Sequence, residues 1–281
     1  MPEWIEIKDV SKKIDGFQLG PVSLSIEPGT ITALVGNNGS GKSTMLKMIM
    51  NLANPDSGEI RVLGKPVDGK DESWKRHVTF QPQNAVGWNA YTGEDLKRLI
   101  APLYPKWDEA VFERMISLFD IPLNKRFGKL SPGVQQKLSL SLALPRSTDI
   151  LILDEPTASL DIPSKNLFMD CLVEWMEQED RAVILTTHET EDIRKLADYL
   201  FLMQGGKPLG HFEKDILAAG YRRFWLHEMP AGPLPGELSR TENQLVSDNP
   251  DATERYLSEH GSPVIDTKAL ELEEIISLLL K

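Results

Sequence analysis

The sequence has a single cysteine, Cys171, and no long run of apolar residues. One cysteine cannot form a disulfide within the chain, and it excludes the paired-cysteine metal sites. A membrane-spanning helix needs roughly 18 consecutive apolar residues, and no stretch approaches that length. The N-terminal residues MPEWIEIKDV alternate charged and apolar side chains, unlike a signal peptide. We therefore expect a cytoplasmic chain that acts at a membrane only through a partner.

Positive charge is also scarce in this chain. It has 31 lysines and arginines against 42 aspartates and glutamates, which gives a formal net charge of −11. Proteins that bind nucleic acids normally present a basic face, so this balance argues against a nucleic-acid partner. Apolar residues make up 41% of the 281 residues, which is ordinary for a globular protein of one or two domains with a sizeable core.

Apolar runs of strand length recur along the chain. Through residue 35, apolar and polar side chains alternate in short stretches separated by turn residues, which predicts short strands. Unbroken apolar runs within 149–156, 182–188 and 199–204 predict buried strands, and segments with helical spacing separate them. Alternating buried strands and helices favour an α/β fold with a parallel sheet and crossover helices.

Two segments depart from this alternation. Helical spacing predicts a helical insertion between two sheet strands, over about residues 84–145. A stretch rich in proline and glycine, 229–237, predicts a loop or linker, and residues 250–281 suggest two short helices. We place a domain boundary near residue 210, so that residues 1–210 and 211–281 form separate domains.

A glycine-rich segment, GNNGSGKST, directly follows the apolar run that ends at residue 35. It fits the pattern G-x-x-x-x-G-K-[ST], in which glycines let backbone amides approach phosphate oxygens at a helix N-terminus. Lys42 would reach the β- and γ-phosphates of a nucleotide, and Ser43 would ligate Mg²⁺. The alternative is a glycine-rich turn with a solvated lysine. The predicted nucleotide-binding residues are Gly36, Asn37, Asn38, Gly39, Ser40, Gly41, Lys42, Ser43 and Thr44.

Two carboxylates end the apolar strand ILILDEP. Asp154 can hold Mg²⁺ through water, and Glu155 can orient or deprotonate an attacking water. His188 ends the next apolar strand, VILTTH, where its neutral ring could contact the γ-phosphate or the water. Ligands of open α/β sheets bind outside the carboxyl ends of the strands, so Gly36, Asp154 and His188 should converge on one crevice. Taken singly, the acidic pair and the histidine have structural alternatives in helix capping and packing.

The stretch KLSPGVQQKLSLSLAL begins an apolar helical pattern directly after Ser-Pro-Gly. Ser131 fits a helix N-cap, and Pro132 fits the first helical position, where a missing amide hydrogen costs nothing. Gly133 keeps the approach to the helix end open. The spacing therefore predicts a helix whose first amides are accessible to an anion, although capping alone also accounts for these residues.

Taken in order, these motifs resemble those of the nucleotide-binding domain of ABC transporters, over roughly residues 3–210. GNNGSGKST resembles the Walker A loop, ILILDEP the Walker B strand with the catalytic glutamate Glu155, and LSPGV a variant of the signature motif. SLD, with Asp161, resembles the D-loop, and TTHE contains the switch histidine His188. VTFQPQNA resembles the Q-loop, in which Gln83, rather than Gln81, follows the proline.

The resemblance implies a fold, an α/β P-loop NTPase of the ABC type. This fold has an N-terminal antiparallel β subdomain, a helical insertion and, in this chain, a small C-terminal α/β extension. Residues 1–210 would be the ABC-type ATP-binding domain, and residues 211–281 a small C-terminal domain that helps subunits pair or regulates them.

The resemblance also implies an ATP hydrolase that uses ATP and Mg²⁺. Its implied catalytic residues are Glu155, His188 and Gln83, and its implied metal ligands are Ser43, Gln83 and Asp154. Ser131 and Gly133 would contact the ATP held by a second subunit, in a homodimer or in a heterodimer with a related subunit. Closure of this dimer on ATP would drive integral membrane permease subunits, so the chain would lie peripherally on the inner face of the cell membrane.

This chain departs from the family pattern at two kinds of position. Pro132 and Val134 replace the usual glycine and glutamine of the signature motif, whereas the phosphate-facing Ser131 and Gly133 are kept. The family often stacks the adenine on an aromatic residue near the start of the second strand. Ile14 stands at about that place and Phe17 is close by, which makes Phe17 the aromatic candidate.

More than one function remains open. The separate ATPase chain, the LSPGV variant and the tail LELEEIISLLL most resemble stand-alone ATPase subunits of bacterial exporters. The alternative is a soluble ABC-type ATPase that acts on nucleic acid or ribosomes, although such proteins usually carry two cassettes, a long coiled coil or zinc cysteines. A binding module that has lost hydrolysis is disfavoured because Lys42, Glu155 and His188 are all present.

Overall fold

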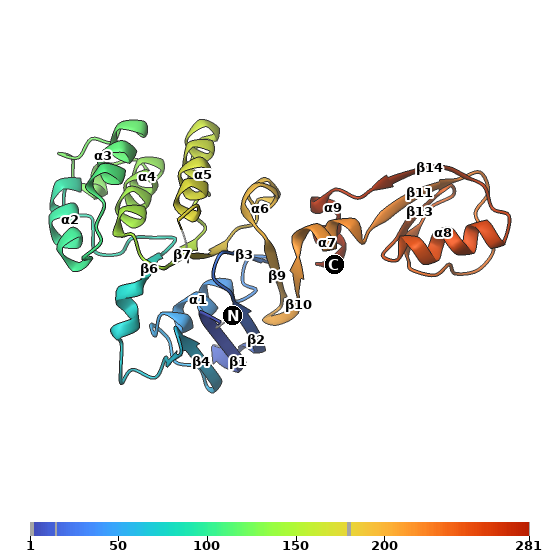
Figure 1. Cartoon of the computed structure of the whole chain (residues 1–281), viewed down its shortest axis with the longest axis horizontal. Coiled ribbons are helices and arrows are strands. Elements are labelled where there is room, and N and C mark those ends of the chain that lie inside the picture. Colours follow the sequence, from blue (N-terminus) through green and yellow to red (C-terminus); the bar gives the residue numbers. More distant parts are fainter. Residues whose placement is uncertain (1–2, 15, 179–180, 281) are drawn as a thin grey trace. The chain divides into compact units, whose positions relative to one another are not determined.

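The computed structural model describes residues 3–14, 16–178 and 181–280 (Figure 1). The chain divides into two compact units, Met1–His211 and Phe212–Lys281. The boundary expected near residue 210 falls inside strand β10 (Lys207–Glu213), the last strand of the central sheet. Each unit has its own sheet and its own buried residues, so each is described by itself.

The first unit is built on a six-stranded sheet. Its spatial order is β10, β9 (Tyr199–Gln204), β3 (Ile31–Val35), β8 (Ala182–Thr186), β7 (Ile150–Asp154) and β6 (Val78–Gln81). The strands from β9 to β6 are parallel, as the sequence predicts. Every residue of β3, β7 and β8 is buried, which is why these strands read as unbroken apolar runs.

An antiparallel sheet of four strands accompanies it, which confirms the predicted N-terminal subdomain. Its order is β2 (Phe17–Ile26), β1 (Ile5–Ile14), β4 (Ser57–Val62) and β5 (Lys65–Pro66). Strands β4 and β5 are separated because Leu63 and Gly64 form a turn with positive φ. Apolar residues of this sheet pack with helix α1 (Lys42–Ile49) in one core cluster.

The predicted helical insertion lies between β6 and β7 and contains three helices, which Figure 1 shows grouped together. They are α2 (Gly93–Ile100), α3 (Glu109–Leu118) and α4 (Pro132–Ala143). Thr92 and Asp95 form a reciprocal capping box at the start of α2. Short 3₁₀ turns join the elements at η1 (Ser73–His77), η2 (Ala101–Leu103), η3 (Phe127–Lys129) and η4 (Leu144–Arg146). The crossover helices α5 (Ile162–Met176) and α6 (Thr190–Leu196) follow β7 and β8.

The second unit is a small α/β structure, as predicted. Its antiparallel sheet has the order β12 (Glu237–Arg240), β13 (Gln244–Ser247), β11 (Arg222–Leu226) and β14 (Val264–Ala269). The helices are α7 (Lys214–Ala219), α8 (Pro250–Glu259) and α9 (Leu272–Leu279), and the last two are the helices expected in residues 250–281. Phe224, Leu226, Leu245 and Leu257 belong to its hydrophobic core. Sequence pattern alone did not reveal these strands, because β12 and β14 bury no residue and so lack the apolar pattern of a core strand.

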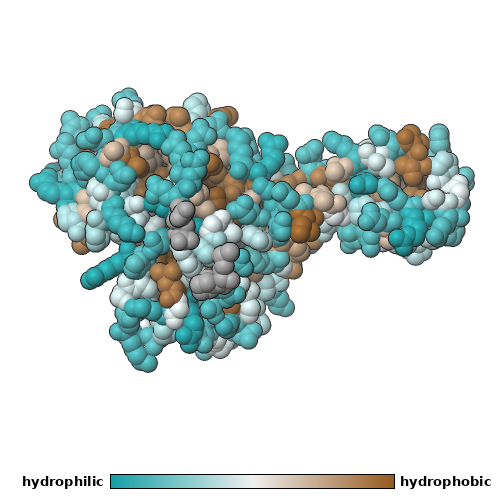
Figure 2. All heavy atoms as spheres, viewed as in Figure 1, coloured by the Kyte–Doolittle hydropathy of each residue, from teal (hydrophilic) through white to brown (hydrophobic). Residues whose placement is uncertain are grey.

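Within the described ranges, every helix is too short or too polar to cross a lipid bilayer. The face drawn in Figure 2 is mostly hydrophilic, with separate hydrophobic patches.

Candidate functional site

The carboxyl ends of the central strands bring the predicted site residues to one edge of the sheet. Strand β8 lies between β3 and β7, and Thr186 at its end pairs with Leu34 on one side and Asp154 on the other. Gly36 and Glu155 follow directly on the ends of β3 and β7, and His188 follows β8 after Thr187. Segments more than 100 residues apart in the sequence thus meet at the place where open α/β sheets bind ligands.

The glycine-rich loop connects β3 to α1. Gly39 and Gly41 have φ values of 79° and 103°, a region that favours glycine. Gly36 has another reason to lack a side chain, since a Cβ there would lie 2.2 Å from the carbonyl oxygen of Met203 in β9. Gly41 also begins α1, so the first amides of this helix open towards the loop. The loop is therefore shaped to hold an anion against a helix N-terminus.

Lys42 lies beneath this loop. Its side chain is buried, and its Nζ donates to the carbonyl oxygens of Gly36 at 2.7 Å and Asn37 at 3.2 Å. Burial lowers the pKa of Lys42, although Glu155 and Asp154 partly oppose this effect. A bound phosphate would supply the negative charge that a buried ammonium group lacks. The Ser40 hydroxyl is also buried, and it finds no hydrogen-bond partner among the described residues.

A set of oxygen atoms surrounds the carboxylate of Asp154, which is 4% exposed. Its Oδ1 accepts from Ser43 Oγ at 3.1 Å and from Thr186 Oγ1 at 2.7 Å. Carboxylate and hydroxyl oxygens are the ligands that Mg²⁺ prefers, so Ser43 and Asp154 fit the donor set of a magnesium site. Gln83, the third predicted ligand, donates its amide to Glu155 instead.

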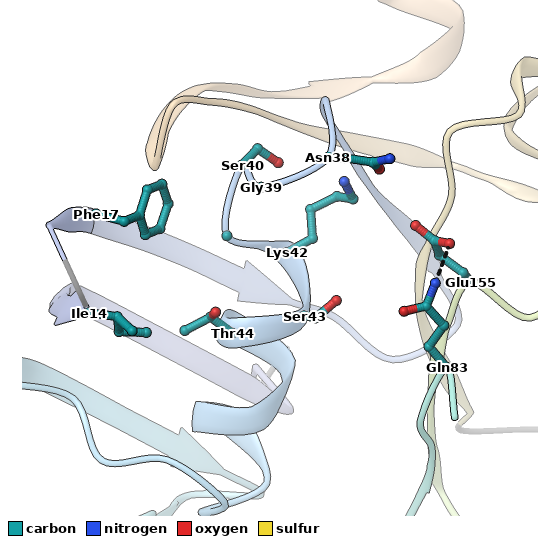
Figure 3. Close-up of a pocket in the computed structure, with 11 residues that line it drawn as sticks. Ile14, Phe17, Asn38, Gly39, Ser40, Lys42, Ser43, Thr44, Gln83 and Glu155 are labelled. Atoms are coloured by element: carbon teal, nitrogen blue, oxygen red, sulfur yellow. Dashed lines mark hydrogen bonds between the residues drawn. The ribbon is translucent and has the colours of Figure 1, made fainter. Parts of the chain in front are cut away.

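The three predicted catalytic residues meet around Glu155. Gln83 Nε2 donates to Glu155 Oε2 at 2.8 Å, and His188 Nδ1 lies 3.8 Å from Glu155 Oε1, beyond hydrogen-bond distance (Figure 3 draws the glutamine contact). Glu155 has a φ of 49°, which is uncommon outside glycine and recurs at functional sites. Its amide donates to Thr186 Oγ1 at 2.8 Å, which holds this turn against β8.

A cleft of about 660 Å³ is lined by residues 38–44 of the glycine-rich loop and helix α1, by Gln83 and by Glu155, whereas Gly36, Asn37, Asp154 and His188 lie outside its lining. Figure 3 shows Ile14 and Phe17 on one side of the glycine-rich loop, and Gln83 and Glu155 on the other. Both residues considered for the adenine line this cleft. The Phe17 ring lies against the backbone of Gly41 and Gly206, where added Cβ atoms would come within 3.4 and 3.0 Å of it.

The helix α4 begins as predicted, with Ser131 as its N-cap and Pro132 as its first residue. The Ser131 side chain accepts from the amide of Val134 at 3.4 Å. A Cβ on Gly133 would lie 2.9 Å from the carbonyl oxygen of Ser159, in the loop that precedes α5. Neither Ser131 nor Gly133 lines the cleft formed by the glycine-rich loop.

Asp161 is the N-cap of helix α5. Its carboxylate accepts from the Ser164 amide at 2.9 Å and from Lys137 Nζ of α4 at 3.1 Å. Hydrogen bonds from Ser164, and then from Lys137, lower the pKa of Asp161 from 3.8 to about 2. Asp161 thus connects the start of α5 to the middle of α4, and it does not line the cleft.

Sequence reasoning missed a buried polar cluster behind His188. Its buried members are Thr157, Lys165, Thr187 and Asp192, and the partly exposed Glu189 joins it through Lys165. In the sequence, Lys165 and Asp192 read as ordinary charged positions of exposed helix faces, and their mutual burial exists only in the folded chain. The paired threonines at the end of the apolar run VILTTH were the one available signal.

Comparison with known proteins agrees with this geometry. Residues 19–158 match the family model described as ABC transporter. The ABC transporter ATP-binding protein YtrB of Bacillus subtilis (strain 168) is 31% identical over 218 residues, which are 77% of this chain and 74% of that protein. The Nod factor export ATP-binding protein I of Rhizobium etli is 30% identical over 220 residues, 73% of this chain and 66% of that protein.

Solved structures share the fold. A structure of an ATP-binding subunit of an ABC transporter has a TM-score of 0.69 at 26% identity, and the match covers 77% of this chain and 92% of that one. A dimeric ATP-binding cassette in a post-hydrolysis state, bound to ADP and Pi, has a TM-score of 0.64 at 22% identity. That match covers 74% of this chain and 98% of the other, and at this identity it is evidence for the fold alone.

Proposed function

This chain belongs to the ABC transporter family as an ATP-binding and ATP-hydrolysing subunit, and on that premise we propose that it powers a separate membrane permease, as an exporter, by closing on ATP as a dimer. One observation carries the proposal. One cleft is bordered by Lys42, Ser43, Gln83 and Glu155, whereas the N-terminus of helix α4, with Ser131 as its N-cap, does not border it. A second subunit is the natural source of that missing helix end.

We propose the following roles for the residues of the cleft. The loop from Gly36 to Thr44 holds the phosphates, with Lys42 on the β- and γ-phosphates, and Phe17 supports the adenine. Ser43 and Asp154 hold Mg²⁺, which when bound neutralises charge on the phosphate oxygens. In the described geometry Gln83 is bonded to Glu155 instead, so a metal contact by Gln83 requires that hydrogen bond to open.

Hydrolysis is assigned to the group around Glu155. Its carboxylate would orient or deprotonate the attacking water, which typically contributes about 10²–10⁴-fold in rate. Gln83 positions the carboxylate through the 2.8 Å hydrogen bond. His188, whose side chain is 56% exposed, is free to reach a γ-phosphate at the mouth of the cleft.

The dimer would place Ser131 and Gly133 of one subunit against the ATP of the other. Support comes from the helix start itself, in which the cap and Pro132 leave the first amides of α4 directed outward as an anion site. The partner is a second copy of this chain or a related ATPase subunit.

A groove on the helical insertion supports docking of the permease. It has a volume of about 280 Å³ and its lining includes Trp88, Tyr91, Leu99 and Leu103. Leu99 is 56% and Leu103 is 69% exposed. Adjacent exposed apolar side chains of this kind mark a surface that a partner covers. Trp107, by contrast, lies outside this groove and packs against Phe112 with ring centres 5.6 Å apart.

Export is the direction we propose, supported by the name of the Nod factor relative, which describes that protein as an export ATP-binding protein. In this arrangement residues 1–210 are the ATPase domain, and residues 211–281 assist pairing or regulate it. The subunit then lies peripherally on the inner face of the cell membrane, held there by the permease.

The dimer is tested with the variant Glu155→Gln, which should bind ATP without hydrolysing it. Addition of ATP and Mg²⁺ should convert the variant from monomer to dimer, as measured by size-exclusion chromatography with light scattering. The double variant Glu155→Gln with Lys42→Ala is the control and should remain monomeric. A Glu155→Gln protein that stays monomeric at saturating ATP would contradict a shared site in a homodimer.

The permease is tested by purifying the native, tagged chain from detergent-solubilised membranes. Recovery of an integral membrane protein, lost when Leu99 and Leu103 are replaced by aspartate, is the expected result. Recovery with ribosomes or nucleic acid instead would favour the alternative class of soluble ABC-type ATPases.

A further inference from the structure

A buried ion pair joins helices α5 and α6 behind the proposed catalytic group. Lys165 is 8% exposed and Asp192 is 2% exposed, and Lys165 Nζ lies 2.6 Å from Asp192 Oδ1. Lys165 also forms an ion pair with Glu189, the residue that precedes α6. Burying two charges is costly unless they are paired and hydrogen-bonded, so such a pair needs a reason beyond stability alone.

The second oxygen of Asp192 links two loops of the site. Its Oδ2 accepts from Thr157 Oγ1 at 2.5 Å and from Thr187 Oγ1 at 3.3 Å. Thr157 lies two residues after Glu155, and Thr187 directly precedes His188. The Thr187 hydroxyl also accepts from the amide of Glu189 at 3.0 Å. One carboxylate therefore ties the segment after Glu155 to the segment before His188.

His188 itself is held through its neighbours. Its ring is more than half exposed, while Thr187 on one side and Glu189 on the other are both bonded into the buried cluster. The backbone position of His188 is thus held from both sides, while its exposed ring can still turn towards the cleft.

We infer that Lys165 and Asp192 are positioning residues, whose buried ion pair holds His188 at the distance from Glu155 that hydrolysis requires. This inference rests on the hydrolytic roles proposed above for His188 and Glu155. Burial lowers the pKa of Lys165, but hydrogen bonds to Asp192 and Glu189 outweigh it and leave the pKa raised, so Lys165 stays protonated at neutral pH. Loss of the pair would let the His188 loop shift while the phosphate loop, on β3 and α1, keeps its shape.

The test compares variants of the full-length chain in ATP hydrolysis. Lys165→Met alone would leave a buried carboxylate without its partner, so the main variant combines Lys165→Met with Asp192→Asn and removes both charges. Its kcat should fall by about 10- to 100-fold, since misplacing a catalytic group by about 1 Å can cost about 100-fold. The KM for ATP should stay within about twofold, because the phosphate loop is untouched.

Two further variants control for general damage. Lys165→Arg keeps the charge and should retain most of the kcat. Lys195→Met removes an exposed lysine of α6 that pairs with Glu191 at 3.1 Å, and it should leave kcat and KM unchanged. A parallel rise in KM and fall in kcat for the double variant, with no rescue by Lys165→Arg, would overturn the inference in favour of a merely structural role.

The decisive measurement repeats the double variant in a His188→Ala background. If the ion pair acts through His188, the added substitutions should slow His188→Ala by less than about twofold, because residues that act as a unit are non-additive. Independent, multiplicative losses would overturn the inference while leaving the proposed function intact. Full activity of His188→Ala would instead refute the proposed role of His188, and the positioning role with it.

Discussion

At the scale of single residues, contacts within the chain leave no room for a side chain at two glycines of the site. Gly36 meets the backbone of β9, and Gly133 meets the carbonyl of Ser159 before α5. A reading from motifs alone explains both by contact with phosphate. The structure adds that a side chain at Gly133 would displace the loop that leads to Asp161, so part of the requirement for glycine there is independent of any nucleotide.

Asp161 gives a prediction about pH. Its folded pKa of about 2 lies below the ordinary value of 3.8, so its contribution to stability is present above pH about 4 and is lost as the pH falls towards about 2. Asp161→Asn keeps an oxygen that can cap α5 but does not titrate. The wild-type protein should therefore have the higher melting temperature from neutral pH down to about pH 4, and the difference should shrink below it.

The measurement is a series of thermal melts of both proteins between about pH 7 and pH 3, at low salt. Added salt should reduce the difference, because the Asp161 side of its contact with Lys137 is exposed to solvent. Parallel melting curves across the whole range would contradict the proposed ionic role of Asp161.

At the scale of elements, the start of α4 serves two purposes that can be separated. The Ser131 hydroxyl caps the helix, and the helix start is the proposed anion site for the partner's ATP. The capping bond is long, at 3.4 Å, so its own contribution to stability is at the low end of the usual range.

Substitutions at Ser131 distinguish these purposes. Ser131→Asp should keep the melting temperature, since aspartate is as good an N-cap as serine, but should lower ATP hydrolysis by about 100-fold or more because its carboxylate repels phosphate. Ser131→Ala should cost about 0.5 kcal/mol in the free energy of unfolding. Calorimetry and a steady-state ATPase assay measure the two effects. Full hydrolysis by Ser131→Asp would exclude a phosphate at this helix end.

At the scale of the whole molecule, the proposed site is shared between two chains, and each chain contributes a different half. The phosphate loop and Glu155 form one half, and the start of α4 forms the other. Defects in opposite halves should therefore complement each other when two variants are mixed, whereas defects in the same half should not.

This prediction uses Lys42→Ala and Ser131→Arg, each of which should be nearly inactive as a homodimer. In an equimolar mixture about half of the dimers pair unlike chains, and each of these has one intact site, so about a quarter of wild-type ATPase activity should return. A mixture of Lys42→Ala with Asp154→Asn is the control and should stay inactive. No recovery in the first mixture would contradict a site shared between copies of this chain.

Much of the fold and of the candidate site was readable from the sequence. The buried strands, the glycine-rich loop, the carboxylates after ILIL and the capped helix at Ser131 all depend on short-range pattern. The choice of Gln83 over Gln81 also rested on local sequence, and in the structure Gln83 borders the cleft while Gln81 is buried. The four strands of the second unit escaped prediction because β12 and β14 bury no residue and none of the four has the unbroken apolar run of the central strands.

The sequence by itself determined where the glycine-rich loop, the strand-end carboxylates and the helix caps stand, because each of these is set by neighbouring residues along the chain. Only the tertiary structure decided what surrounds them. It placed Thr186 against Asp154, Ser159 against Gly133, and Lys165 against Asp192. These contacts join segments far apart in the sequence. A buried charge must be paired, and a close backbone contact leaves no room for a side chain, and neither requirement can be read from neighbouring residues.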